Sequence, residues 1–208
     1  SDNTVNIAKE SGVTVIEKKV NKGYTDSCMI GFKESLKTNS NIVSLIDSDG
    51  TFSPNDLKKM IPYLENCDMV VGTRQVQTLT EKGNQNSMFY VWGNMVLAKL
   101  LQLKYFSLLH LGIVQLTDVG CSYRCIRKDA LEKIIDELTN PVDPSILKPK
   151  NWLFSIYMTM LSIENDLKIV EIPLTFRKRD IGESKSEVTK KSKGFVYGIK
   201  FLWFILKR

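Results

Sequence analysis

The sequence predicts an α/β domain in which helices flank a mostly parallel sheet. Short apolar runs of strand length alternate with longer segments of helical periodicity, and turn or capping residues separate them. With 208 residues, 43% of them hydrophobic and 25% charged, the chain is long enough to bury one sizeable core. We therefore expect most of the chain to form one domain.

The first half of the chain contains the clearest alternation. A strand, a helix and a second, buried strand make a parallel crossover unit, predicted at residues 13–18 (VTVIEK), 26–37 and 41–46 (NIVSLI). Ser53 is a candidate N-cap, and Pro54 suits the first position of the helix that follows. Residues 68–74 (DMVVGTR) are predicted to form the next buried strand.

The second half is less regular but keeps the same two kinds of element. Helical segments are predicted at residues 88–111, 129–138 and 152–163. Strands are predicted at residues 121–127 (CSYRCIR) and 167–176 (LKIVEIPLTF), and a proline-broken loop at 140–150. Near the end, Phe195, Ile199 and Leu202 recur at helical spacing and predict a terminal helix.

Two carboxylates stand one residue apart directly after the buried strand at 41–46. In open α/β sheets ligands bind beyond the carboxyl ends of strands, where Asp47 and Asp49 fall. Two carboxylates in such a turn can hold Mg²⁺ or Mn²⁺, and the cation would remove their mutual repulsion. A solvated turn in which one aspartate caps the next helix is the alternative.

Four segments, taken in order, resemble family 2 glycosyltransferases, in particular the dolichol-phosphate mannosyltransferase and polyprenyl-phosphate glycosyltransferase group. They are residues 21–35 (NKGYTDSCMIGFKES), 41–74 around the acidic turn, 117–131 (TDVGCSYRCIRKDAL) and 171–185 (EIPLTFRKRDIGESK). The resemblance implies a Rossmann-like GT-A fold and metal-dependent, inverting transfer from a UDP- or GDP-sugar to a polyprenyl or dolichyl phosphate.

The resemblance also implies roles for individual residues. Asp47 and Asp49 would hold Mg²⁺ or Mn²⁺ and, with Gly23 and Arg74, bind the nucleotide sugar, while Asp49 and Asp118 would act at the reacting centre. The acceptor phosphate would be bound by a mostly basic set: Arg124, Arg177, Arg179, Ser184 and Lys185. For Asp118, a turn aspartate that bonds its own backbone is the alternative.

The family's opening motifs, P-x-x-N-E and D-D-x-S, are not found before residue 21. The chain begins at what resembles the residues just after the second motif. We therefore expect the first β-α-β part, which holds the nucleotide base and ribose in the family, to lie upstream of this sequence. A degenerate copy that lacks this part is the alternative. The expected division is a catalytic domain over 1–186 and a basic amphipathic helix over 187–208.

Positive charge is concentrated at the end of the chain. The formal net charge is +6, and from Arg177 onward ten Lys or Arg face only three acidic residues. Apolar residues interleave with these cations, which predicts a helix lying in a membrane interface at the cytoplasmic face. A helix packed on the body, or one leading into a transmembrane segment outside this sequence, is the alternative. A membrane-protein partner or a second copy of the chain is a further expected partner.

Other classes of function are disfavoured. The four cysteines include no C-x-x-C pair and the single histidine is His110, which argues against a zinc site. No recognition helix or aromatic sheet motif indicates a nucleic-acid partner, although a non-catalytic binding module stays open. Transfer to a saccharide or protein hydroxyl also stays open, because a fold does not define the acceptor.

Overall fold

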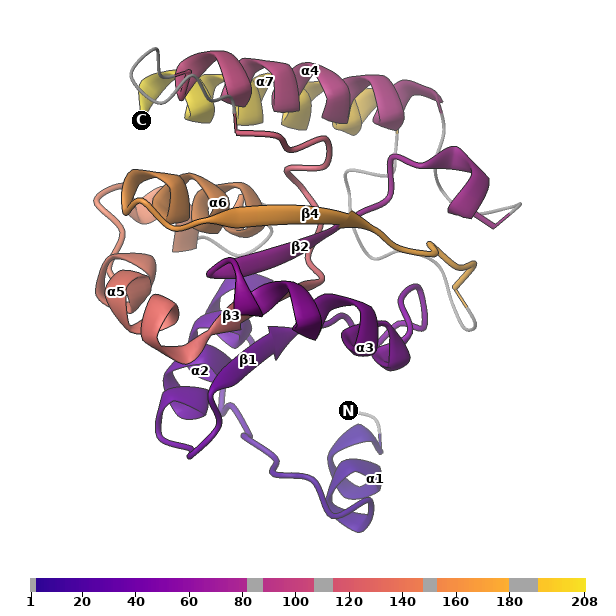
Figure 1. Cartoon of the computed structure of the whole chain (residues 1–208). Helices are drawn as coiled ribbons and strands as arrows, with labels where there is room; N and C mark the ends of the chain where they lie inside the picture. Colours follow the sequence, from indigo (N-terminus) through magenta and orange to yellow (C-terminus); the bar gives the residue numbers. More distant parts are fainter. Residues whose placement is uncertain (1–2, 82–87, 107–113, 148–152, 180–190) are drawn as a thin grey trace.

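The computed structural model describes residues 3–81, 88–106, 114–147, 153–179 and 191–208 (Figure 1). The helices are α1 (Thr4–Glu10), α2 (Tyr24–Leu36), α3 (Leu57–Met60), α4 (Met88–Lys104), α5 (Lys128–Thr139), α6 (Phe154–Glu164) and α7 (Lys191–Lys207). Short 3₁₀ turns are η1 (Pro54–Asp56), η2 (Ile61–Glu65), η3 (Gln77–Leu79) and η4 (Pro144–Leu147). The strands are β1 (Ile42–Leu45), β2 (Met69–Thr73), β3 (Arg124–Arg127) and β4 (Ile169–Pro173).

The four strands form one sheet in the order β1-β3-β2-β4. β2 and β4 pair in parallel, whereas β3 runs antiparallel to both β1 and β2. Three of the four strands therefore share one direction, as predicted, but the pairing is mixed because β3 is inserted between two of them in the opposite sense. The long segment between β2 and β3 leaves and re-enters the sheet at the same edge, so that β3 begins where β2 ends and runs in the opposite direction.

The predicted strand at residues 13–18 is not formed. The segment has no regular structure, and Val13 and Ile16 are exposed. A strand needs a neighbouring strand to satisfy its backbone, and among the described residues none pairs with this segment. Helix α1 before it buries no residue and stands off the body in Figure 1.

Helix α6 lies at the centre of the helical layers. Every residue from Phe154 to Ser162 is buried, so the helix is covered on all sides, as expected of a core helix. Helix α5 contacts both α2 and α6, and α4 lies alongside α7 in a further layer (Figure 1). Ser53 caps η1 as predicted, its hydroxyl accepting from the Asn55 N–H at 3.3 Å.

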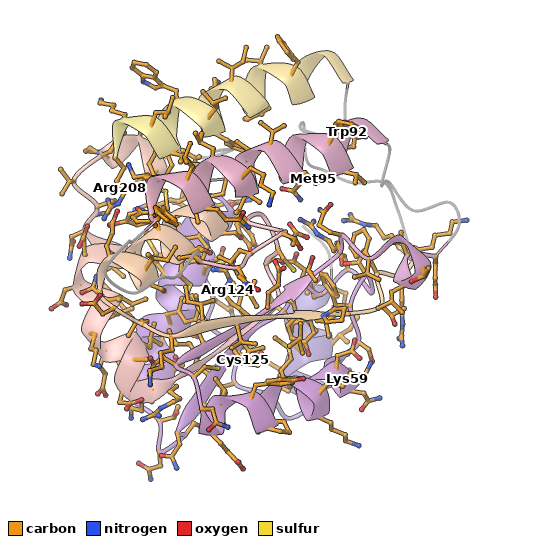
Figure 2. All side chains as sticks on the ribbon, turned by 45° about the horizontal axis from the view of Figure 1, so that its top comes forward. Lys59, Trp92, Met95, Arg124, Cys125 and Arg208 are labelled. Atoms are coloured by element: carbon orange, nitrogen blue, oxygen red, sulfur yellow. The ribbon has the colours of Figure 1, made fainter. Side chains whose placement is uncertain are left out.

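Helix α7 is fixed to the body at its last turn. Phe204 and Ile205 are buried, and Phe204 meets the ring of Tyr157 on α6. Arg208, labelled in Figure 2, donates to Glu137 of α5 at 2.5 Å and to Glu164 of α6 at 2.7 Å. None of the helices in the described ranges is both long and apolar enough to cross a bilayer.

Gly72 allows β2 to approach the segment that follows β4. A Cβ at this position would lie 2.6 Å from Leu174 Cδ1, inside the contact distance of real atoms. We expect Gly72→Ala to lower the free energy of unfolding by about 1–3 kcal/mol, because Leu174 is buried and has to shift. Urea unfolding measures this change.

Gly31→Ala is the matched control, because a Cβ there meets nothing within 4 Å and the site is inside helix α2. It should be neutral or stabilising by up to about 1 kcal/mol. Equal stability of the Gly72 variant and the wild type would contradict the close approach.

Candidate active site

Four chain segments meet at one edge of the sheet. The carboxyl ends of β1, β2 and β4 lie there together with the amino end of β3, as the strand registers require. Asp47 and Asp49 follow β1, Arg74 follows β2, and Ser122 precedes β3. The predicted acidic turn thus lies where the chain brings its polar side chains together.

Asp47 is largely shielded from water. Its Oδ2 accepts a hydrogen bond of 2.5 Å from the Ser122 hydroxyl. Burial raises its pKa, the bond from Ser122 acts in the opposite direction, and the nearby Asp49 charge adds to the rise. Asp47 also lines a cavity of about 390 Å³ between α2 and β1, together with Tyr24 and Cys28. A cation at this position would stabilise its ionised form.

Asp49 is held through both carboxylate oxygens. Its Oδ1 accepts from the Thr51 backbone N–H at 3.1 Å and from the Thr51 hydroxyl at 2.6 Å. Its Oδ2 accepts from Arg179 Nη2 at 2.5 Å, across 130 positions of sequence. The acidic turn and the basic ending of the domain, predicted separately, are therefore in direct contact.

Backbone bonds hold the segment after β4 against the acidic turn. The Phe176 N–H donates to Leu79 O, and the Arg177 N–H donates to Thr51 O, both at 2.9 Å. The Lys178 N–H donates to the Glu81 carboxylate, also at 2.9 Å. These bonds fix the main chain just before Arg179, so that its side chain reaches Asp49.

Asp118 is buried and paired with Arg74. Arg74 Nε and Nη2 donate to the two carboxylate oxygens, each at 2.7 Å, and Asn94 of α4 donates to Oδ1 at 2.8 Å. Burial alone would raise the pKa of Asp118, but the attraction and hydrogen bonds of Arg74 outweigh it and lower the pKa. Asp118 is therefore ionised at neutral pH, and its partner is the arginine predicted to bind the nucleotide sugar.

Glu171 of β4 fixes the backbone around Asp118. Its carboxylate accepts from the Thr117 N–H at 2.8 Å, from the Thr117 hydroxyl at 2.6 Å and from the Asp118 N–H at 2.8 Å. Burial raises its pKa, and these bonds oppose the rise. The sequence motif at 171–185 contains Glu171 but predicts no role for it.

Aromatic rings connect the acidic turn to the Arg74 pair. Phe52 packs against Tyr123 and Phe176, with ring centroids 5.4 and 5.3 Å apart. The Arg74 guanidinium carbon lies 5.6 Å from the centroid of Phe176, at the distance of a cation–π contact. These rings therefore link the acidic turn to the Arg74–Asp118 pair through apolar contacts.

The structure corrects the prediction for Arg124. Its side chain has no exposed surface and lies inside the molecule in Figure 2. It donates to the carbonyls of Cys121 at 2.5 Å and Ser155 at 3.2 Å, and burial lowers its pKa. Arg124 therefore ties β3 to α6 and does not reach an acceptor phosphate, because a guanidinium on a strand buried on both faces cannot meet solvent.

The remaining predicted site residues do not form one group in the structure. Gly23 is the N-cap of α2 with φ of 98°, a left-handed conformation that favours glycine, and its N–H donates to Asn21 Oδ1 at 2.9 Å. Arg177 is exposed beside Arg179. Ser184 and Lys185, and the domain boundary predicted at 186, lie outside the described residues.

The donor set at the acidic turn fits a hard divalent cation. Asp47 and Asp49 offer two carboxylates, and Mg²⁺ characteristically uses one or two together with waters and phosphate oxygens. Within the described ranges, no group of three or more His, Cys, Asp or Glu side chains gathers to form a complete protein-only metal site. An ion here would need further ligands from water or from a bound molecule.

The sequence predicts no site role for three polar residues that the structure places there: Thr51, Asn94 and Ser122. Each is a short side chain of a common type with no motif of its own. Only Thr51 had a usable signal, since an Asp-x-Thr spacing predicts the local turn that Asp49 forms. Asn94 and Ser122 come from distant segments and are recognised only once the fold is known.

Curated relatives support the predicted resemblance. The chain is 28% identical over 180 residues to polyprenol monophosphomannose synthase from Mycolicibacterium smegmatis and 26% identical to undecaprenyl-phosphate mannosyltransferase from Micrococcus luteus. Both alignments cover 86% of this chain, but only 62% and 66% of those proteins. Dolichol-phosphate mannosyltransferase from Pyrococcus furiosus is 27% identical over 83% of this chain and 43% of its own length.

The fold and the family are both shown. The crystal structure of glucosyl-3-phosphoglycerate synthase from Mycobacterium tuberculosis matches all of this chain and 65% of that one, with a TM-score of 0.55 and 13% identity. This likeness confirms the predicted GT-A fold. The family model for glycosyl transferase family 2 matches residues 1–135. The sheet edge with its acidic turn therefore belongs to a protein of glycosyl transferase family 2.

Proposed function

We propose that the chain transfers a sugar from a nucleoside diphosphate sugar to a polyprenyl or dolichyl phosphate, with inversion at the sugar carbon. The observation that carries the proposal is the contact between the acidic turn and the basic segment after β4, through Asp49 and Arg179. It places residues suited to a metal–diphosphate and residues suited to an acceptor phosphate at one sheet edge. Three relatives are named as mannose-transferring enzymes of this kind, which makes mannose the first sugar to test.

Asp47 and Asp49 would hold Mg²⁺ or Mn²⁺ against the donor. Bound there, the ion supplies positive charge that offsets the charge of the departing diphosphate. The Thr51 bonds to Asp49 and the Ser122 bond to Asp47 orient the two carboxylates in advance. Gly23 and the cavity beside Asp47 would contribute to binding of the nucleotide sugar.

Arg177 and Arg179 would bind the acceptor phosphate. A lipid phosphate is already an anion at neutral pH, so the protein has to hold it in line and offset its charge and needs no general base. Asp118 is ionised and fully paired, which supports a role in holding Arg74 at the site edge rather than in proton transfer. A saccharide hydroxyl acceptor would instead require a base near the reacting atoms.

The test is an assay that measures release of the nucleoside diphosphate from GDP- and UDP-sugars in the presence of Mn²⁺ or Mg²⁺. Each donor is offered with undecaprenyl phosphate, with dolichyl phosphate, with simple saccharides, or without an acceptor. Metal-dependent release that requires a polyprenyl phosphate supports the proposal. Release that requires a saccharide selects the hydroxyl acceptor, and salt-sensitive binding of nucleic acid without turnover selects a binding module.

We further propose that the outer face of α4 and α7 lies on a membrane surface. The two helices lie side by side, and both expose large apolar side chains: Trp92, Met95, Val96, Leu103, Phe195, Val196, Ile199, Trp203 and Leu206. Figure 2 shows Trp92 and Met95 on α4. Exposed patches of this kind mark interaction sites, and lysines such as Lys200 and Lys207 flank this one.

The cytoplasmic side of the membrane suits the chemistry of the four cysteines. Cys28, Cys67, Cys121 and Cys125 are all free and buried. Free thiols are typical of a reducing compartment. The same two helices could instead contact a membrane-protein partner or a second copy of the chain. Binding to protein-free vesicles would favour the membrane surface over these two partners.

Trp203→Glu should weaken binding to vesicles of anionic phospholipid by about tenfold, because an aromatic ring that is 64% exposed on α7 is replaced by a charge. Sedimentation with vesicles measures it. Substitution is preferable to truncation of α7, since Phe204 and Ile205 belong to the core. Tyr63→Glu on η2, half-exposed on another surface, is the control and should bind as the wild type does. Equal losses in both variants would contradict the assignment of this face.

A further inference from the structure

Asp49 Oδ2 is the oxygen that a metal ion would use, and Arg179 already occupies it. The other oxygen, Oδ1, accepts two hydrogen bonds from Thr51 that build the turn. Arg179 Nη2 lies 2.5 Å from Oδ2. Asp49 therefore has no carboxylate oxygen without a partner in this arrangement.

A divalent ion and the guanidinium compete for this oxygen, because both are cations. A metal bound to a carboxylate oxygen lies about 2.1 Å from it, so it would stand within a few Å of the Arg179 nitrogen. Two cations that close repel each other strongly even with partial screening by water. Both side chains are about one-quarter exposed, at 27% for Arg179 and 25% for Asp49, so the screening is incomplete.

The exchange needs only a side-chain rotation. Hydrogen bonds to Leu79, Thr51 and Glu81 hold the main chain at residues 176–178. The arginine side chain is long and has several rotatable bonds, so it can leave Asp49 while its backbone stays in place. The released guanidinium would remain near the metal and the phosphates that the ion binds.

We propose that Arg179 serves as the counter-ion of Asp49 while the metal is absent and is displaced from Oδ2 when a divalent cation binds. Metal entry and release of Arg179 are then one event, and the arginine lowers the affinity of the site for metal alone. This inference depends on the metal site of the proposed function. It makes a prediction about metal binding that does not involve turnover.

The experiment titrates the protein with Mn²⁺ alone and follows the free ion by electron paramagnetic resonance. The variants are Arg179→Gln, Arg179→Lys, Lys178→Gln and Asp49→Asn. Lys178 is the matched control, because its loss removes one positive charge at the neighbouring, exposed position and leaves the backbone bond to Glu81 possible. Thermal unfolding of each variant confirms that it is folded.

We expect Arg179→Gln to bind Mn²⁺ at least about fivefold more tightly than Lys178→Gln, the factor expected when a partly exposed ion pair no longer competes. Arg179→Lys should stay within about twofold of the wild type, because it restores the competing cation. Equal affinities of the Arg179→Gln and Lys178→Gln variants would overturn the exchange.

The Asp49→Asn variant separates this failure from failure of the proposed function. If Asp49→Asn loses Mn²⁺ binding but the two Gln variants are equal, the metal site stands and only the exchange with Arg179 is wrong. If Asp49→Asn binds Mn²⁺ as the wild type does, the ion lies elsewhere. In that case the exchange and the proposed metal site both fail.

Discussion

Asp49→Asn is expected to lower sugar transfer by more than about 100-fold, the loss typical of removing one preorganised electrostatic contact to the transition state. Asparagine keeps an oxygen that can accept from Thr51, so the turn after β1 is preserved while the negative charge is lost. The measurement is the turnover rate with GDP- or UDP-sugar at saturating donor and limiting metal.

Asp129→Asn is the control for this prediction. Asp129 also pairs with an arginine, Arg127 at 2.5 Å, but it lies on the opposite edge of the sheet, where β3 ends. Its loss should leave transfer unchanged. Stability should fall by less than about 1 kcal/mol in both variants, since both pairs are at least partly exposed. Full activity of Asp49→Asn at limiting metal would refute the metal-ligand role.

Arg74→Met should lower the free energy of unfolding by about 3–5 kcal/mol, because it leaves the Asp118 carboxylate buried without its guanidinium partner. Asp118 is 1% exposed, so water cannot replace the lost bonds. Chemical unfolding at pH 7 measures the change. Arg127→Met breaks the exposed pair with Asp129 and should leave stability close to that of the wild type, because water screens this pair.

The pH dependence follows from the direction of the Asp118 shift. Its pKa is lowered in the folded protein, so its contribution is present above its unfolded value, near 4, and is lost as the pH falls through the folded value. The difference between wild type and Arg74→Met should therefore be largest at neutral pH and shrink below about pH 4. A difference that is small at pH 7, or that grows on acidification, would contradict the pairing.

A second substitution distinguishes lost pairing from lost packing. Adding Asp118→Leu to Arg74→Met removes the buried charge that the first change left alone. The double variant should recover part of the lost stability. If it is less stable than Arg74→Met, the damage comes from packing against Phe176 and not from an unpaired carboxylate.

The local patterns of the sequence determined most elements of the fold. Apolar runs of four or five residues predicted β1 and β2, and Ser53 with Pro54 predicted the start of η1, because these signals act over a few neighbouring residues. The same locality explains the error at residues 13–18. A strand pattern is only satisfied when another strand lies beside it, and the pattern itself contains no information about that neighbour.

The acidic turn and the basic ending were each predicted from short motifs, but their contact was not. Only the tertiary structure decided that Arg179 meets Asp49, that Arg74 is the partner of Asp118, and that Arg124 is buried. The physical reason is that a motif specifies which side chains are present, whereas strand order and register decide which of them face each other across the sheet edge. The insertion of β3 between β1 and β2 brings Ser122 to Asp47 and turns Arg124 into the core.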